Sequence, residues 1–140
     1  MSAPDIPTVL VIEDDDDSRA LLATLLTFHG FEVRTARNGL EGLRAARESK
    51  PCSILLDLHM PVMDGATFRR EQLRDSELAE VPVICVSALS SRSPAARELG
   101  RVAFVQKPYD FGQLLDVIAR MTGLWTRYPQ SAALPDDRVH

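Results

Sequence analysis

Apolar residues gather in five short runs, separated by stretches in which apolar positions recur with helical spacing. The runs cover residues 9–12, 31–36, 52–56, 83–86 and 102–105. Four of them are nearly continuous, which is typical of parallel strands that are covered on both faces. The run FEVRTA at 31–36 alternates instead, and this pattern favours a strand at the edge of a sheet.

Helix-like stretches follow these runs. The first apolar stripe ends at Gly30, the second ends at ESKP, and Asp110 is a suitable cap for the last. The stripes contain Leu21, Leu22, Leu25, Leu26 and Phe28; Leu40, Leu43 and Ala46; and Phe111, Leu114, Leu115, Ile118 and Met121. Five βα units in series predict an α/β fold, a doubly wound five-stranded parallel sheet with helices on both faces. We expect one domain over residues 8–123, after an extension at 1–7 and before a flexible tail at 124–140.

Composition narrows the functional classes. Apolar content of 45% and charged content of 26% are ordinary for a soluble globular protein. The net charge of −4 gives no broad attraction for nucleic acid or an anionic membrane. No run approaches the ~20 apolar residues of a membrane span, and the opening MSAPDIPT lacks a signal-peptide pattern. We therefore expect a cytoplasmic protein in which Cys52 and Cys85, both in apolar runs, are reduced core residues.

The carboxyl ends of the predicted strands carry polar residues. The first strand runs into Glu13 and Asp14, the third ends at Asp57, the fourth reaches Ser87 and the fifth reaches Lys107. Each one alone has an ordinary explanation as a cap, a loop residue or a solvated charge. In a doubly wound sheet, however, ligands bind outside these strand ends, so we interpret the five together as a site.

The grouping suggests phosphoryl transfer. Clustered carboxylates repel one another, and a Mg²⁺ ion (or Mn²⁺) would offset that repulsion while also binding phosphate oxygens. Asp57, after an apolar strand, is the candidate nucleophile. Glu13, Asp14, Ser87 and Lys107 would supply the metal site, the hydroxyl and the ammonium that a transferred phosphoryl group needs. The residues alone thus predict a Mg²⁺-dependent phosphorylation of an aspartate.

Four motifs together resemble the receiver domain of two-component response regulators: VLVIEDDDDSR, ILLDLHMPVMDG, VICVSA and FVQKPY. The resemblance covers roughly residues 8–122 and implies a flavodoxin-like sheet with strand order 2-1-3-4-5. It also implies that Asp57 is the phosphoacceptor in a phosphorelay, with a sensor histidine kinase or a histidine phosphotransfer protein as donor. Such a domain is not an ordinary enzyme, although it promotes its own phosphorylation and dephosphorylation, and it switches the binding of a downstream protein.

The same resemblance assigns the remaining positions. Glu13 and Asp14 become the acidic pair, and His59 would offer its backbone carbonyl, not its imidazole, to Mg²⁺. Ser87 takes the switch hydroxyl position, Lys107 pairs with the phosphate and contributes to catalysis with Ser87, and Phe104 matches the aromatic switch. The loop after the phosphoacceptor is MPVMDG, and Pro108 is expected to follow a cis peptide bond. The alternative for Phe104 is a simple core aromatic.

Within the acidic run, the resemblance separates two roles. Glu13 and Asp14 are metal-site residues, whereas Asp15, Asp16 and Asp17 form the solvated entry to the first helix. Either Asp17 or Ser18 is the expected N-cap.

Other classes fit less well. A haloacid dehalogenase-type phosphatase needs a second Asp two positions after the nucleophile, where this chain has His59. A flavin-binding relative needs a hydroxyl-rich phosphate loop after the first strand, and an EF-hand loop needs a Gly and a later Glu that are missing here. A receiver-like interaction module that works without phosphorylation stays open as the alternative.

Two features depart from a standard arrangement. About eighteen residues follow the last helix, which leads us to expect a stand-alone receiver. Lys107 follows Ser87 by 20 positions, about two fewer than the resemblance implies. In the segment LSSRSPAARELG we expect a short helix of about six residues, with Ser93 as N-cap, Pro94 first and Gly100 just beyond its end. Two interpretations stay open: the deletion is a harmless one in a surface element, or residues 88–93 form a mobile loop and the surface usually used for symmetric dimers is remodelled.

Overall fold

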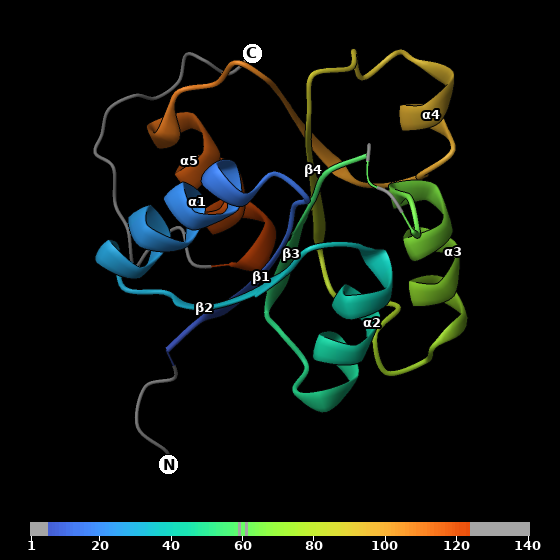
Figure 1. The fold of residues 1–140 in the computed structure, drawn as a ribbon, viewed down its shortest axis with the longest axis horizontal. Coiled ribbons are helices and arrows are strands. Elements are labelled where there is room, and N and C mark those ends of the chain that lie inside the picture. Colours follow the sequence, from blue (N-terminus) through green and yellow to red (C-terminus); the bar gives the residue numbers. More distant parts are fainter. Residues whose placement is uncertain (1–5, 59, 61, 124–140) are drawn as a thin grey trace.

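The protein contains a five-stranded parallel sheet with helices on both faces (Figure 1). The structure is a computed structural model and describes residues 6–58, 60 and 62–123. The strands are β1 Thr8–Ile12, β2 Glu32–Ala36, β3 Ser53–Leu56, β4 Val83–Ser87 and β5 Ala103–Gln106. The helices are α1 Asp16–Phe28, α2 Gly39–Glu48, α3 Gly65–Arg74, α4 Pro94–Arg97 and α5 Phe111–Thr122. The sheet order is β2-β1-β3-β4-β5, which confirms the predicted flavodoxin-like topology.

The strand boundaries agree with the apolar runs to within one residue at each end. β2, the one alternating run, lies at an edge of the sheet as predicted. Alternate residues of the central strands point to opposite faces. In β1, Val9 and Val11 pack toward α1 and α5, while Leu10 and Ile12 pack toward α2 and α3. The same separation of the two helix pairs on either side of the sheet is visible in Figure 1.

Parts of the predicted stripes are exposed. Leu22 and Leu26 are buried on α1, but Leu21 and Phe28 have 60% and 82% of their surface exposed. Leu21 and Phe28 are seven positions apart and therefore share a helix face, which is rotated by about 100° from the face of Leu22. In α2 and α5, Leu40 and Met121 are also exposed at their edges. The prediction that every apolar residue of these helices belongs to the buried face was therefore wrong.

Cys52 is exposed, so its assignment to the core was wrong, whereas Cys85 is buried as predicted. Cys52 precedes β3 at the edge of the sheet opposite to the polar strand ends. Its backbone N–H donates to Thr8 Oγ1 at 3.1 Å, and its Sγ lies 3.7 Å from the same hydroxyl. A residue at the very start of a strand is not yet covered by the helices that bury the strand centre.

α4 is the short helix that the sequence predicts. Ser93 is its N-cap, with Ala96 N–H donating to the Ser93 hydroxyl at 3.1 Å, and Pro94 is the first helical residue. The helix contains four residues instead of the expected six, and Gly100 follows with a φ of +77°. Residues 88–93 contain no helix. Whether this segment is mobile, and whether the dimer surface is remodelled, stay predictions.

None of the helices in the described ranges is long and apolar enough to cross a membrane. The expected flexible tail at 124–140 and the extension before residue 6 lie outside the described residues.

Candidate functional site

The ends of β1 and β3 bring three carboxylates together. Ile12 pairs with Leu56 in the sheet, so Glu13 and Asp57 follow at neighbouring positions. The strand bonds continue past the strand ends: Glu13 N–H donates to Ala36 O at 3.0 Å, and Asp57 N–H donates to Ile12 O at 3.1 Å. The backbone of both acids is therefore held by the sheet. Glu13 and Asp57 are buried, while Asp14 is exposed.

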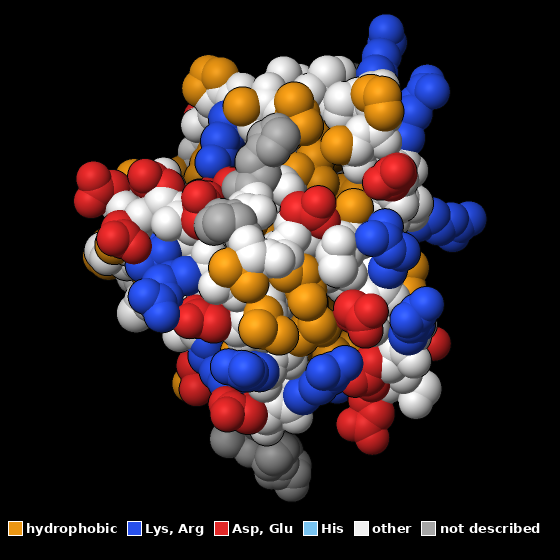
Figure 2. All heavy atoms as spheres, turned by 45° about the vertical axis from the view of Figure 1, so that its right-hand side comes forward, with side chains coloured by type: hydrophobic (Ala, Val, Ile, Leu, Met, Phe, Trp, Pro, Cys, Tyr) orange, Lys and Arg blue, Asp and Glu red, His pale blue; other side chains and the backbone are white. Residues whose placement is uncertain are grey.

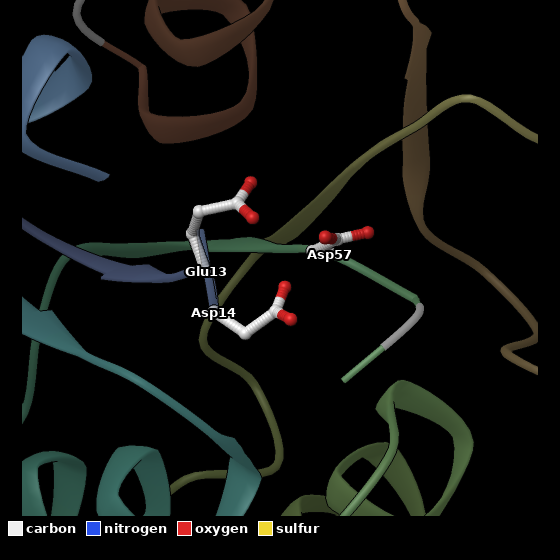
Figure 3. A group of neighbouring side chains, drawn as sticks. All are labelled: Glu13, Asp14 and Asp57. Atoms are coloured by element: carbon white, nitrogen blue, oxygen red, sulfur yellow. The ribbon is translucent and has the colours of Figure 1, made fainter. Parts of the chain in front are cut away.

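Carboxylate oxygens of Glu13, Asp14 and Asp57 lie within 4.8 Å of one another. Figure 3 shows the three side chains facing a common space at the strand ends. Three negative groups at this separation raise the energy of the folded state unless a cation is shared among them. Hard oxygen ligands are those that Mg²⁺ and Mn²⁺ bind, so the residues present fit such an ion. His59, the fourth predicted ligand, lies outside the described residues.

Lys107 supplies a positive charge beside this cluster. Its Nζ donates to Glu13 Oε1 at 3.2 Å, in a pair whose side chains are 31% and 5% exposed. Burial acts to lower the pKa of Lys107, but the Glu13 carboxylate and the charge of Asp57 outweigh it and raise the pKa above the ordinary lysine value. The ammonium is therefore charged at neutral pH. The bond between Lys107 and Pro108 is cis, as predicted.

Ser87 is fully buried at the carboxyl end of β4, next to β3 in the sheet. Its carbonyl accepts from Lys107 N–H at 2.8 Å, and its hydroxyl accepts from Leu89 N–H at 3.1 Å. Ser87 thus contacts both the lysine backbone and the start of the next loop. Its hydroxyl is bonded to that loop in this conformation, and its contact with a phosphoryl group stays a prediction.

Phe104 lies in β5 and is partly buried. It packs against a cluster made by Leu58, Cys85, Ala96 and Leu99. Leu58 directly follows Asp57, and Ala96 belongs to α4. Phe104 therefore packs in the same cluster as the residue after Asp57 and a residue of α4, which suits both a switch residue and a core aromatic. The two alternatives stay open.

The entry to α1 differs from the prediction. Asp15, not Asp17 or Ser18, is the N-cap: Ser18 N–H donates to Asp15 Oδ2 at 2.8 Å, and this hydrogen bond lowers the pKa of Asp15. Asp15 N–H in turn donates to Glu13 Oε2 at 3.1 Å. The buried Glu13 carboxylate orders the turn, so the helix starts earlier than a run of equivalent aspartates suggests. Asp15, Asp16 and Asp17 are exposed, as expected.

Arg19 is a residue near the site that sequence reasoning missed. Its guanidinium donates to Glu13 O at 2.9 Å and to Asp14 O at 3.5 Å, and it also pairs with Asp16. It thereby fixes the backbone of both Glu13 and Asp14 from α1. The spacing of three between Asp16 and Arg19 was the available signal, since such pairs are neighbours on a helix.

The loop after Asp57 returns to the sheet at the start of α3. Asp64 is the N-cap of α3, and Gly65 N–H donates to Leu58 O at 3.2 Å. A Cβ on Gly65 would lie 3.0 Å from Leu58 Cα and 3.1 Å from Asp57 O. Gly65 therefore allows α3 to approach the backbone of Asp57 and Leu58 directly. Of the predicted loop residues, Met60 is buried and Pro61 lies outside the described residues.

Comparison with known proteins agrees with this geometry. The family model of the response regulator receiver domain matches residues 9–119. The transcriptional regulatory protein PrrA of Mycobacterium tuberculosis is 38% identical over 135 residues, which cover 95% of this chain and 56% of that protein. The chain thus spans about half the length of PrrA. The polar-differentiation response regulator DivK of Brucella anthropi is 31% identical over 118 residues, covering 83% of this chain and 96% of DivK.

Solved structures show the same fold. The signal receiver domain of a histidine kinase from Syntrophus aciditrophicus superposes with a TM-score of 0.77 at 28% identity, covering 93% of this chain and 99% of that domain. The family match extends over most of the chain and includes the strand ends that carry Glu13, Asp14 and Asp57. The chain therefore belongs to the response regulator receiver domain family of two-component signalling.

Proposed function

We propose that this receiver accepts a phosphoryl group on Asp57 in a reaction that depends on Mg²⁺ or Mn²⁺. The observation that carries the proposal is the cluster of Glu13, Asp14 and Asp57 oxygens within 4.8 Å, with the Lys107 ammonium 3.2 Å from Glu13. A carboxylate held rigidly among other carboxylates and a lysine suits an acceptor whose product carries still more negative charge.

In the proposed transfer, a carboxylate oxygen of Asp57 attacks the phosphorus of a phosphohistidine on the donor protein. A P–O bond forms, the P–N bond breaks, and its electron pair returns to the imidazole nitrogen of the donor. A divalent ion held by Glu13, Asp14 and Asp57, with the predicted His59 carbonyl, would neutralise charge on the phosphoryl oxygens. The backbone bond from Asp57 N–H to Ile12 O keeps the attacking group in place throughout.

Lys107 and Ser87 would hold the product. The ammonium of Lys107 already lies beside Asp57 and Glu13, so it can donate to a phosphoryl oxygen with a short movement. The hydroxyl of Ser87 would exchange its bond with Leu89 N–H for one to the phosphoryl group. Phe104, which packs beside α4, would follow this exchange. The chain is thus a phosphoacceptor that promotes its own phosphorylation and dephosphorylation, not an ordinary enzyme.

We assign a sensor histidine kinase or a histidine phosphotransfer protein as the donor, and a downstream protein as the target. A cytoplasmic location and the absence of direct contact with nucleic acid or membrane belong to the same proposal. So does the stand-alone arrangement, with one domain over residues 8–123. Its support is the match with DivK along nearly the whole of that protein.

The test is phosphoryl uptake from acetyl phosphate, followed by the mass of the intact protein. The wild type should gain one phosphoryl group with Mg²⁺ and almost none after chelation. Asp57→Asn should abolish uptake, while Asp116→Asn, which changes an aspartate of α5, should leave it unchanged. A wild type that takes up no phosphoryl group would contradict the proposal and support an interaction module that works without phosphorylation. Equal uptake by Asp57→Asn would exclude Asp57 as the acceptor.

A further inference from the structure

A buried arginine on α3 has no carboxylate partner among the residues that the structure describes. Arg69 is 8% exposed, and its guanidinium donates three hydrogen bonds to neutral oxygens. Nε donates to Leu99 O at 2.9 Å, one terminal nitrogen to Gln72 Oε1 at 2.8 Å, and the other to Arg101 O at 3.1 Å. Burial lowers the pKa of Arg69, yet an arginine stays protonated in proteins. A charge is therefore kept in the interior.

Gln72 extends this arrangement in the other direction. It is fully buried one turn after Phe68, and its Nε2 donates to Leu78 O at 2.9 Å and to Val81 O at 3.1 Å. One unbroken set of hydrogen bonds thus joins the α3–β4 connection, α3 itself and the α4–β5 connection. We call Arg69 and Gln72 the α3 anchor.

The α3 anchor holds a turn that would otherwise have little support. Leu99 and Arg101 flank Gly100, just after the four-residue helix α4. A helix of this length is not stable through its own hydrogen bonds. The planar guanidinium fixes two carbonyls of the turn from one rigid group, which an apolar side chain cannot do. The end of α4 is therefore tied to α3.

The anchored turn also lies close to the phosphorylation site. The Leu99 side chain is 1% exposed and packs with Leu58, Cys85 and Ala96. Leu58 directly follows Asp57. A displacement of the acceptor loop would therefore press against Leu99, and the bonds of Arg69 to the backbone on either side of Gly100 oppose that displacement.

Residues 88–93, on the other side of α4, have a different set of contacts. Four of the six are exposed. The backbone bonds within the segment are local, with Ser93 N–H donating to Ser90 O at 3.0 Å and Arg92 N–H to Ser90 Oγ at 3.0 Å. Two bonds join the start of the segment to the sheet: Leu89 N–H donates to the Ser87 hydroxyl, and Gln106 Nε2 of β5 donates to Ala88 O at 3.4 Å. This segment is thus attached where the switch hydroxyl lies and is exposed beyond it.

We propose that Arg69 and Gln72 are positioning residues, which hold residues 99–101 against α3 and, within the connection between β4 and β5, confine the rearrangement after phosphorylation to residues 88–93. The proposal has two halves. The first, that the α3 anchor holds residues 99–101, is independent of phosphorylation; the second, the confinement of the rearrangement, rests on the proposed function. A partner protein would therefore recognise the changed conformation of residues 88–93 and not a displacement of α4. Figure 2 shows the face that carries α3 and α4, where Lys and Arg side chains stand on the surface beside Asp and Glu side chains. Arg69 differs from such surface residues, because it is only 8% exposed.

Hydrogen exchange of backbone amides in the unphosphorylated full chain tests the first half. Arg69→Met should accelerate exchange in α4 and at residues 99–101 by about tenfold or more, because charge-assisted bonds are lost, and should change β1 and β3 by less than about twofold. Arg70→Met is the matched control: Arg70 is the next residue, is exposed, and donates to Thr67 Oγ1 at 3.2 Å, so its loss should change little. Arg69→Lys should not restore protection from exchange, since an ammonium cannot donate to both carbonyls of the turn from one planar group.

The double variant Arg69→Leu, Gln72→Leu guards against simple unfolding, because it replaces both polar side chains of the α3 anchor and so leaves no polar side chain there without a partner; only backbone carbonyls lose their donors. It should remain folded and still show accelerated exchange at residues 99–101. Unchanged exchange there in both variants would overturn the proposal. An equal acceleration in β1 and β3 would also overturn it, because the α3 anchor would then serve global stability alone.

The second half is tested by amide chemical shifts with acetyl phosphate and Mg²⁺. Within the connection between β4 and β5, large shift changes in the wild type should stop before α4; in the double variant they should extend to residues 99–101. Wild-type changes at 99–101 as large as those at 88–93 would refute the confinement. If the wild type takes up no phosphoryl group, the proposed function fails, while the exchange experiment still decides whether the α3 anchor exists.

Discussion

The Lys107 ammonium and the Glu13 carboxylate, 94 positions apart in the chain, meet at 3.2 Å across the ends of β1 and β5. Glu13 is at the same time one of the three acids that could bind a metal ion. The Glu13 carboxylate thus pairs with the Lys107 ammonium and also belongs to the group of acids that could bind a metal ion. The occupancy of the metal site should therefore depend on the charge of Lys107.

Removal of the lysine charge should strengthen metal binding. Lys107→Met leaves the three carboxylates without their neighbouring cation, and we expect the Kd for Mg²⁺ to fall about fivefold, which corresponds to about 1 kcal/mol at a partly exposed site. Calorimetric titration measures it. The only other lysine, Lys50, is exposed and lies between α2 and β3, so Lys50→Met is the matched control and should leave Kd unchanged. Weaker binding by Lys107→Met would show that the lysine does not oppose the ion.

The same pair should make stability fall at high pH. The pKa of Lys107 is raised above its ordinary value of 10.5, so the folded state holds this proton more tightly than the unfolded state. The stabilisation is complete below pH 10.5 and is lost as pH rises through the folded pKa. Burial also raises the pKa of Tyr109, which acts in the same direction. Urea unfolding between pH 9 and 12 should show a smaller decline for Lys107→Met than for wild type or Lys50→Met. Parallel declines in all three would argue against the pair.

Asp64 should stabilise α3 in a pH-dependent way. It accepts a hydrogen bond from Thr67 N–H at 2.9 Å, and the pKa of Asp64 is lowered from 3.8 chiefly by that bond. We expect Asp64→Ala to reduce the free energy of unfolding by about 1 kcal/mol at neutral pH. Because a lowered pKa stabilises only above the unfolded value, the difference from wild type should shrink as pH falls below 3.8. Asp64→Asn, which keeps an acceptor without a charge, should lose less stability than Asp64→Ala at pH 7 and should not share the pH dependence of the wild type. A difference that stays constant down to pH 3 would exclude the ionised cap.

The two thiols should differ in reactivity. Cys52 is exposed, whereas Cys85 is buried, and burial together with the charge of Asp57 raises the pKa of Cys85 to about 12. In the native protein an aromatic disulfide reagent should therefore modify one thiol quickly. Cys52→Ser should remove that reaction, Cys85→Ser should preserve it, and urea should expose the second thiol. Fast modification of native Cys52→Ser would mean that β4 opens readily.

The fold and the acidic cluster were predictable because both follow from the strands. A parallel strand covered on two faces has to be apolar, and its end is where polarity begins, so Asp57 could be located from the run before it. The buried polar pair was not found in this way. In FRREQLR, Arg69 and Gln72 read as a solvated face, although Gln72 lies four positions after the buried Phe68 and therefore on the same side of α3. That spacing was the one available signal.

Errors at the ends of elements have a common cause. Four consecutive aspartates have equal intrinsic preference for the N-cap, and the choice of Asp15 depends on a bond to the Glu13 side chain that only the folded chain supplies. Cys52 and Phe28 were assigned to the core because they are apolar, but cover depends on which helix lies above them. The fluorescence of Trp125, the only tryptophan of the sequence, should change little when a metal ion binds. Trp125 lies outside the described residues, as does His59.

The hydrogen bond between Leu89 N–H and the Ser87 hydroxyl also affects how many unphosphorylated molecules adopt the other orientation of Ser87. A neutral hydrogen bond contributes about 0.5–1.5 kcal/mol, which is a factor of about two to twelve in population. If no other contact discriminated between the two orientations of Ser87, a sizeable minority of molecules would carry the other orientation before any signal arrives. Background output, and not only the strength of the response, would then be set by this one contact. A substitution that changes the strength of this bond, for example Ser87→Thr, would change the background output and the response together.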